Sequence, residues 1–192
     1  MLDPNQVQVL FADLQTQIVQ RSKTTPPEAL SQAAAVLARL AKLFALPMHH
    51  SVVPEGEQAP QVVEELARET AGVPQFLRVS ASPFTDEKTR TALSSTGRRT
   101  LLVAGCATEV VVVHAVQEAI AAGYQVYVPV DACGSMSART EEAAFREIEA
   151  AGGVTTSVVT LASALAPDFS TELGKQTFDI VQTYESAVLG LP

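Results

Sequence analysis

Short apolar runs alternate with helix-like segments along most of the chain, which is the pattern of an α/β protein. The clearest example lies between residues 100 and 135. Leu101–Val103 is an unbroken apolar run, as in a strand that is buried on both faces, and a helical pattern begins at Thr108 and ends at Gly123. Tyr124–Val130 is a second β-rich run. These segments predict a right-handed βαβ unit with parallel strands.

The same alternation continues on both sides of this unit. The predicted strands are Val7–Ala12, Leu46–Val53, Pro74–Ser80, Leu101–Val103, Tyr124–Val130 and Val154–Thr160. The predicted helices are Ala29–Phe44, Val62–Glu69, a helix capped by Thr85 or Asp86 that runs to Thr96, Thr108–Gly123, Ala138–Ala151 and Leu161–Leu165. We therefore expect a three-layer, Rossmann-like α/β fold with a six-stranded parallel sheet and helices on both faces.

In open parallel sheets, ligands bind beyond the carboxyl ends of the strands. Asp13 directly follows the first predicted strand, and the loops 105–108 and 131–134 follow the fourth and fifth. We expect all three segments at the functional edge of the sheet. An acid in this place can take part in chemistry or can cap the next turn, and the spacing alone leaves both interpretations of Asp13 open.

Composition narrows the classes of ligand. The 192 residues are 47% hydrophobic, which suits one globular domain with a sizeable core. A net charge of −8 argues against a general nucleic-acid binder, because such proteins need a basic face. No apolar run is long enough to span a bilayer, and the first residues do not resemble a signal peptide. We expect a cytoplasmic protein that binds a small molecule, and neither nucleic acid nor membrane.

Residues that often bind metals are few. Cys106 and Cys133 are too few for a disulfide framework and lack the spacing of a zinc site. His49 and His50 are neighbours in a predicted strand, so their side chains point to opposite faces and cannot readily share one metal ion. We expect no metal and no cofactor. His114 could face the binding site or pack in the core, and packing is the favoured interpretation.

The last part of the chain differs from the alternating pattern before it. Residues 1–166 are predicted to form one domain, and residues 167–192 a helical tail with several apolar residues. Such a tail either packs on its own domain or docks on a neighbouring subunit. The sequence shows no internal repeat and no second domain.

Five segments carry recognisable motifs. They are LFADLQ (residues 10–15), RVSASPF (78–84), LLVAGCATEV (101–110), HAVQEAIAAGYQVYVPVDACGS (114–135) and AFREIEAAGGVTTS (144–157). In order and spacing they resemble the isochorismatase-like hydrolase superfamily, which includes isochorismatases and nicotinamidases. The resemblance runs from about residue 7 to residue 159. It implies the fold of that superfamily and a hydrolase of a small metabolite.

The resemblance also implies a site at the strand ends made of an aspartate, a lysine and a cysteine, whose thiolate attacks an amide carbon. Asp13 matches the aspartate, and Gln15 matches the glutamine of the Asp-x-Gln motif. The lysine position, six residues before Phe84, is occupied by Arg78. Arginine stays protonated, so Arg78 can orient Asp13 or bind a carboxylate but cannot donate a proton. Gln15 and Phe84 are expected to contact the substrate.

The expected nucleophile position is altered. Members resemble G-x-x-T-(D/E)-x-C-V, and the cysteine of that pattern falls on Val111, which has no lone pair. The resemblance further implies a non-proline cis peptide at Cys106–Ala107 and an oxyanion hole made by the N–H groups of Ala107 and Val111. Because backbone donors do not depend on the side chain, the site could still bind a carbonyl or a carboxylate. Cys106 and Cys133 are better interpreted as small buried hydrophobes than as displaced nucleophiles.

Two functions remain open. In the first, the protein is an isochorismatase-family hydrolase that acts without a thiol, with Asp13 as general acid or base on an enol ether and Arg78 on a substrate carboxylate. The alternative is a family member without catalysis that binds a metabolite or has a regulatory or structural role. The sequence does not decide whether the protein is an enzyme. Superfamily relatives are often oligomeric, so we expect a homo-oligomer in both cases.

Overall fold

The computed structural model describes residues 1–189 and has a parallel sheet at its centre. Its strands are β1 (Val7–Ala12), β2 (Met48–Val52), β3 (Gln75–Leu77), β4 (Thr100–Cys106), β5 (Gln125–Pro129), β6 (Cys133–Gly134) and β7 (Val154–Thr156). They lie in the order β3-β2-β1-β4-β5-β7, and the two-residue strand β6 pairs with β4. Every strand pair is parallel, which confirms the predicted parallel α/β sheet.

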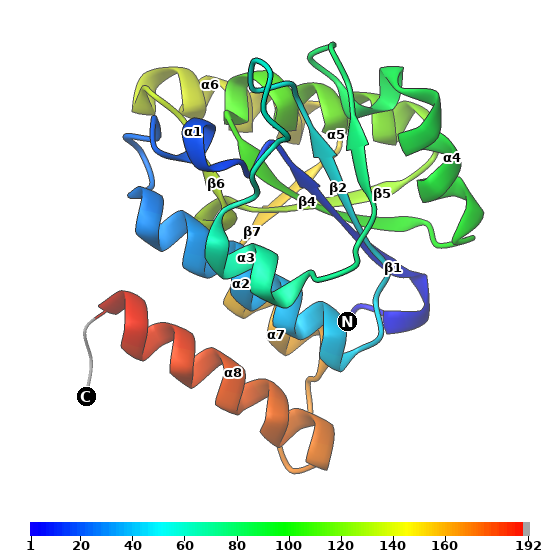
Figure 1. The fold of residues 1–192 in the computed structure, drawn as a ribbon. Helices are drawn as coiled ribbons and strands as arrows, with labels where there is room; N and C mark the ends of the chain where they lie inside the picture. The colour runs from blue at the N-terminus through cyan, green and yellow to red at the C-terminus, as the bar shows by residue number, and fades with distance from the viewer. Residues whose placement is uncertain (190–192) are drawn as a thin grey trace.

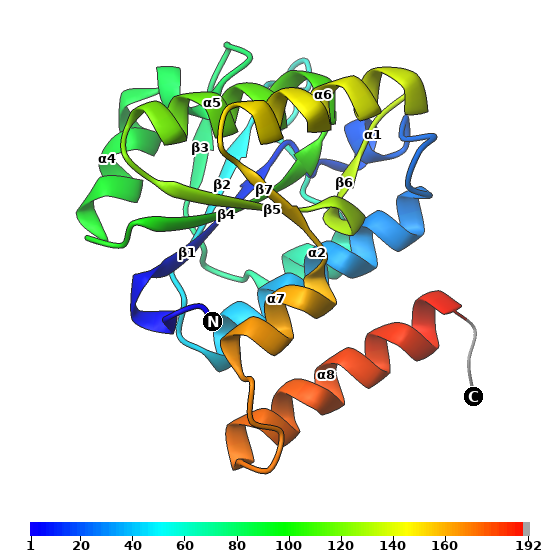
Figure 2. The same cartoon turned by 180° about the vertical axis from the view of Figure 1, so that it is seen from behind.

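Helices cover both faces of this sheet. They are α1 (Thr16–Val19), α2 (Pro27–Leu43), α3 (Glu64–Glu69), α4 (Glu87–Ser95), α5 (Val113–Ala121), α6 (Ala138–Ala150), α7 (Val158–Leu165) and α8 (Glu172–Leu189). Figures 1 and 2 show α4, α5 and α6 on one face, and α2, α3 and α7 on the other. The helix α8 lies outside α2, so three layers carry a further helix on one side (Figure 1).

The central strands β1 and β4 are buried along their whole lengths. Alternate residues of β1 enter two separate hydrophobic clusters, because successive side chains of a strand point to opposite faces. Val9 and Phe11 pack in the cluster under α2, and Leu10 and Ala12 pack in the cluster under α5. Burial on both faces explains the unbroken apolar runs in these strands.

The helix α2 is buried between the sheet and α8. Its buried residues are Leu30, Ser31, Ala33, Ala34, Ala35, Val36, Leu37, Ala38, Leu40 and Ala41. Such a wide buried surface differs from the single apolar stripe of a surface helix. The small alanine side chains allow close approach of the elements on either side.

The sixth predicted strand is partly wrong. The strand β7 ends at Thr156, and α7 begins at Val158 instead of Leu161. The Ser157 hydroxyl accepts a hydrogen bond from the Thr160 N–H at 3.1 Å, and the Asp131 carboxylate accepts from the Val158 N–H at 3.0 Å. These two acceptors satisfy the free N–H groups of the helix start, which outweighs the β propensity of the sequence.

The predicted helical tail is present as α8 within the described residues, and residues 190–192 lie outside them. Val181 and Tyr184 are buried in the same hydrophobic cluster as α2 and α7. The Tyr184 hydroxyl donates a hydrogen bond to Asp131 at 3.3 Å. The helix therefore packs on its own chain, while the division at residue 166 stays a prediction. Of the helices in the described part of the chain, none has the length and apolar character needed to cross a bilayer.

Candidate active site

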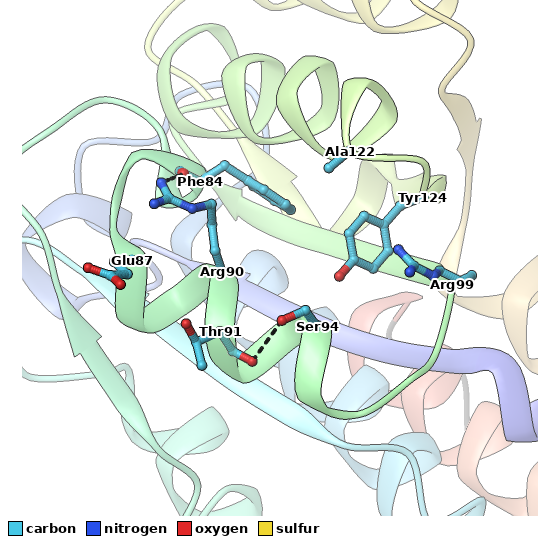
Figure 3. A pocket seen from close by; sticks show the side chains of 8 residues that line it. All are labelled: Phe84, Glu87, Arg90, Thr91, Ser94, Arg99, Ala122 and Tyr124. Atoms are coloured by element: carbon cyan, nitrogen blue, oxygen red, sulfur yellow. Dashed lines mark hydrogen bonds between the residues drawn. The ribbon is translucent and has the colours of Figure 1, made fainter.

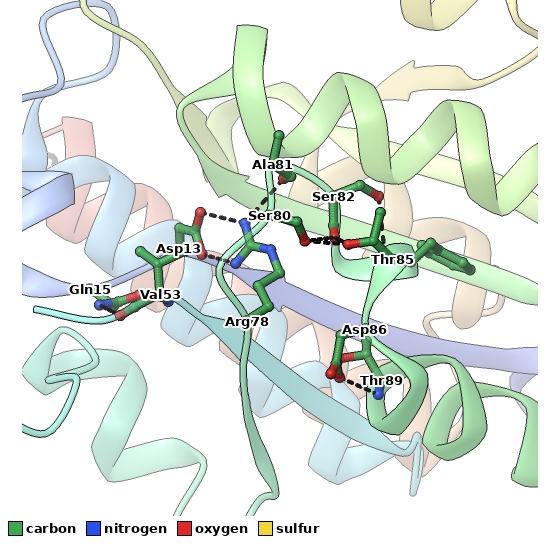
Figure 4. A network of polar contacts seen from close by, with 11 residues as sticks. Asp13, Gln15, Val53, Arg78, Ser80, Ala81, Ser82, Thr85, Asp86 and Thr89 are labelled. Carbon is green, nitrogen blue, oxygen red and sulfur yellow. Dashed lines mark hydrogen bonds and ion pairs between the residues drawn. The ribbon is translucent and has the colours of Figure 1, made fainter.

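An ion pair lies at the carboxyl ends of the strands. Asp13 follows β1, and Arg78 follows β3. The backbone N–H of Arg78 donates to the Val52 carbonyl at 2.9 Å. The two guanidinium Nη atoms of Arg78 donate to the two carboxylate oxygens of Asp13 at 2.6 and 2.7 Å (Figure 4). The side chains are only 2% and 9% exposed, respectively. Because β2 separates β1 from β3, the Arg78 side chain must reach across the end of β2.

Burial and charge act on Asp13 in opposite directions. Burial raises the pKa of the Asp13 carboxyl above its ordinary value, and the hydrogen bonds and charge of Arg78 offset part of that rise. The Asp13 backbone has φ of 55°, in the left-handed region that Asp and Asn tolerate better than most residues. Its N–H donates to the Ser51 carbonyl at 2.9 Å, which fixes the residue against β2.

Gln15 joins two of the strand-end loops. Its side-chain amide donates to the Val53 carbonyl at 3.0 Å, and its side-chain oxygen accepts from the Val53 N–H at 2.8 Å (Figure 4). The residue is completely buried. Both ends of the Gln15 amide are thus occupied by protein backbone, and the residue holds the loop after β1 against the loop after β2. Its contact with a substrate stays a prediction.

The loop after Arg78 is fixed by its own hydrogen bonds. Arg78 also donates to the Ala81 carbonyl at 3.2 Å, and the Ser82 hydroxyl accepts from the Phe84 N–H at 3.1 Å. Asp86 caps α4 by accepting from the Thr89 N–H at 2.7 Å, as predicted. The Ala81 contact was missed from the sequence, because a backbone acceptor leaves no trace in residue type.

The loop after β4 contains the expected cis peptide, between Cys106 and Ala107. It leads into a π-helical turn over Thr108–Val112, in which the Val111 N–H donates to the Ala107 carbonyl at 3.0 Å. The Val111 side chain is completely buried in the cluster that includes Ala12. The Val111 N–H therefore already has a partner within the turn, and an oxyanion hole made by Ala107 and Val111 stays a prediction.

Neither cysteine has the environment of a nucleophile. Cys106 is 3% exposed, and burial, followed by the charges of Glu109, Asp13 and Glu141, raises the pKa of its thiol to about 12. Cys133 is completely buried, and burial raises its thiol pKa strongly. Thiolates, not thiols, attack carbonyl carbons, so burial and the raised pKa values disfavour both side chains as nucleophiles.

Phe84 lies between the Arg78 loop and a groove of about 390 Å³ on the α4 side of the sheet. The groove is lined by Phe84, Glu87, Arg90, Thr91, Ser94, Arg99, Ala122 and Tyr124 (Figure 3). The Phe84 and Tyr124 rings meet edge to face at 6.0 Å between centroids. Phe84 is 5% exposed and forms a packed wall of the groove, and its role in substrate binding stays a prediction.

The histidines occupy three different environments. His50 stacks on Phe11 and lies 3.0 Å from the Thr70 hydroxyl, on the α2 side of the sheet. His49 is buried on the opposite side, beside Phe76, which confirms that the two adjacent residues diverge. His114 is exposed, so the favoured interpretation as a core histidine is wrong. The buried face of α5 is formed by its Val and Ala residues, and His114 falls outside it.

Known proteins resemble this chain in sequence and in fold. Residues 7–159 match the isochorismatase domain. The probable hydrolase YcaC of Escherichia coli (strain K12) is 29% identical over 152 residues, which are 79% of this chain and 73% of that protein.

Two solved structures agree with the whole fold. YcaC from Pseudomonas aeruginosa, with hexane-2,5-diol and covalent acrylamide, has a TM-score of 0.87 at 25% identity and covers 98% of this chain and 96% of that one. The E. coli YcaC gene product, described as an octameric hydrolase of unknown specificity, has a TM-score of 0.87 at 27% identity, with coverages of 98% and 95%. Because the domain match covers most of the sequence, the chain belongs to the isochorismatase family.

Proposed function

We propose that the protein is a hydrolase of a small metabolite that works without a thiol nucleophile and uses Asp13 as general acid and base. The observation that carries this proposal is the buried Asp13–Arg78 pair at the carboxyl ends of β1 and β3. This edge is where open parallel sheets bind ligands. A buried carboxyl with a raised pKa is suited to carry a proton, and perturbed carboxyls cluster at functional sites.

The absence of a thiol route rests on three residues. The position that the family resemblance assigns to the nucleophile is Val111, and the thiols of Cys106 and Cys133 are buried with raised pKa values. The P. aeruginosa relative was solved with covalent acrylamide, an electrophile that forms bonds with nucleophiles. Position 111 of this chain is a valine, which has no nucleophilic atom that could form such a bond.

A reaction without a nucleophilic side chain is available for an enol ether. The protonated Asp13 carboxyl donates its proton to the enol-ether carbon, which leaves an oxygen-stabilised cation. Water adds to that cation and returns a proton to the Asp13 carboxylate. The resulting hemiketal breaks its carbon–oxygen bond to give a carbonyl compound and an alcohol. Arg78 orients Asp13 and, once one of its Nη atoms is released, can hold a substrate carboxylate.

A specific observation favours the second candidate, which is binding without turnover. Both carboxylate oxygens of Asp13 accept from Arg78, so the guanidinium already occupies both oxygens that a reaction would need. The Val111 side chain is completely buried and presents no reactive atom. A remnant site of this kind would hold a metabolite at the strand ends without transforming it.

The deciding experiment is turnover of isochorismate and of a panel of small amides by the purified protein, beside Asp13→Asn and Val111→Cys. Turnover of isochorismate by the wild type that is lost in Asp13→Asn establishes hydrolysis without a thiol. Circular dichroism of Asp13→Asn must first show that the variant is folded. A silent wild type, with amide hydrolysis gained in Val111→Cys, instead establishes an intact scaffold that lacks only its nucleophile.

We also propose that the protein assembles as a homo-oligomer. The E. coli relative of the same fold is described as octameric. The helix α8 exposes Phe178 (45%) and Leu173 (40%), and Phe169 (49%) just before it is also exposed. The rings of Phe169 and Phe178 lie 6.0 Å apart, so they form one apolar surface suited to a second copy.

A further inference from the structure

Unpaired buried polar atoms gather on one side of the sheet. Within the described part of the chain, seven buried side-chain nitrogen and oxygen atoms have no hydrogen-bond partner. Five of these belong to Gln8, His49, Ser51 and Arg78: Gln8 Oε1, both His49 ring nitrogens, Ser51 Oγ and Arg78 Nε. All four residues are at least nine-tenths buried, with exposures of 0%, 7%, 0% and 4%.

Strand geometry places these atoms along one face. His49 and Ser51 are two residues apart in β2, so their side chains point to the same side. Ser51 pairs with Ala12 of β1 and with Phe76 of β3, and Ala12 packs in the cluster under α5. Arg78 stands two residues beyond Phe76 and crosses the end of β2 to reach Asp13. The Arg78 side chain therefore passes over the end of the strand that carries Ser51 and His49.

Hydrogen-bonding capacity on this face is complementary. Both Nη atoms of Arg78 donate to Asp13, and one of them also donates to the Ala81 carbonyl, so Nε is the guanidinium nitrogen without a partner. A serine hydroxyl donates and accepts, and a neutral imidazole offers one donor and one acceptor. Burial lowers the pKa of His49, which favours the neutral ring at neutral pH. A buried polar atom without a hydrogen-bond partner costs about 1–3 kcal/mol. A buried water molecule usually removes that cost, because it makes about 2–4 hydrogen bonds to such atoms.

We propose that His49 and Ser51 hold ordered water that bridges them to Arg78 Nε, and that this water fixes the guanidinium against Asp13. His49 and Ser51 are then positioning residues for the ion pair, which act through Arg78 and touch no substrate. The role holds whether the site catalyses a reaction or only binds a ligand, because it concerns the geometry of the pair alone.

The first test is a high-resolution crystal structure of the wild type. Ordered water within hydrogen-bonding distance of Arg78 Nε and of Ser51 Oγ or a His49 nitrogen is expected. A dry, closely packed face overturns the proposal.

The second test compares thermal midpoints of Ser51→Ala and the wild type. If water bridges the hydroxyl, removing it takes a partner from that water, and the midpoint falls. If the face is dry, removing an unpaired buried hydroxyl leaves the midpoint unchanged or raises it, which contradicts the proposal. This variant removes one atom from a buried side chain and should fold.

The third test measures the titration of Asp13 itself, by recording the NMR chemical shift of its carboxyl carbon as a function of pH. A guanidinium that is held less firmly stabilises the carboxylate less, so Ser51→Ala and His49→Phe should raise the Asp13 titration midpoint by about one unit. His50→Phe is the matched control, because His50 faces Thr70 on the other side of the sheet. Unchanged midpoints in both variants, or an equal shift in the control, would show that His49 and Ser51 do not position Arg78.

Discussion

Arg78 is 4% exposed, and its buried charge depends on one counter-ion, Asp13. Replacing Arg78 with methionine should keep most of the packing volume while leaving the Asp13 carboxylate buried and unpaired. We expect the free energy of unfolding to fall by about 3–5 kcal/mol at neutral pH, the usual effect of breaking a buried pair. Urea denaturation measures this change.

The matched control for this prediction is Arg68→Met. Arg68 pairs with Glu64 on the surface, where the side chains are 69% and 73% exposed. Water screens that pair, so its loss should change the unfolding free energy by at most about 0.5 kcal/mol. Equal effects of the two substitutions would mean that burial does not set the strength of the Asp13–Arg78 pair.

The buried side chain of His50 should make the free energy of unfolding depend on pH. Burial, and then the neighbouring charge of His49, lowers the pKa of His50 to about 4 from an ordinary 6.5. Between these values the unfolded chain binds a proton that the folded protein excludes, so stability falls as the pH drops from 6.5 towards 4. The loss attributable to His50 should reach about 3 kcal/mol.

Urea denaturation of wild type and His50→Phe at pH 7.5 and 4.5 measures that loss. The phenylalanine can keep the stacking on Phe11, and the Thr70 hydroxyl keeps its bond to the Leu66 carbonyl. The variant should therefore lose less stability on acidification than the wild type. The same loss in both proteins would assign the acid sensitivity to other groups.

Among the secondary-structure elements, α7 depends on its cap. The Ser157 hydroxyl accepts from the Thr160 N–H, so Ser157→Ala should lower the unfolding free energy by about 1 kcal/mol. Ser163→Ala is the control, because this exposed serine lies inside the same helix and alanine favours helices. Thermal or urea unfolding of both variants would contradict the capping role if Ser163→Ala were the more damaging change.

The elements that the sequence predicts best are those with one dominant physical cause. The strands β1 and β4 are buried on both faces, so their apolar runs predict them directly. The strand predicted to continue after Thr156 is wrong there, because helix capping by Ser157 competes with β propensity. The predicted burial of His114 is wrong, because the sequence around a single histidine on a helix does not show whether its side chain faces the core or the solvent.

The candidate site is predictable in part for a similar reason. Asp13 and Arg78 were identified by motif spacing and the structure brings them into direct contact. Their bidentate geometry depends on the strand order β3-β2-β1, which places two loops 65 residues apart in sequence at one edge. The bond between Gln15 and the Val53 backbone depends on that order as well, and no local pattern reveals it.

For the whole molecule, the prediction concerns assembly. Light scattering coupled to size-exclusion chromatography should give a mass well above that of one 20.3 kDa chain, and eight copies would match the E. coli relative. Phe178→Glu should reduce that mass, because it places a charge on the apolar surface of α8. Ala122→Glu, an exposed position after α5, should leave the mass unchanged. A monomeric wild type would remove the case for a homo-oligomer.

The burial of α2 between the sheet and α8 also determines how long this helix stays exposed while the chain is being synthesised. The alanine-rich helix is made early in synthesis, and the residues that cover its outer side, Val181 and Tyr184, are made near the end. At roughly 5–20 residues per second, the ribosome leaves that side of α2 without its cover for roughly seven to twenty-eight seconds. During this interval the nascent chain exposes an apolar helix face, and a chaperone that recognises such faces would meet it before α8 emerges.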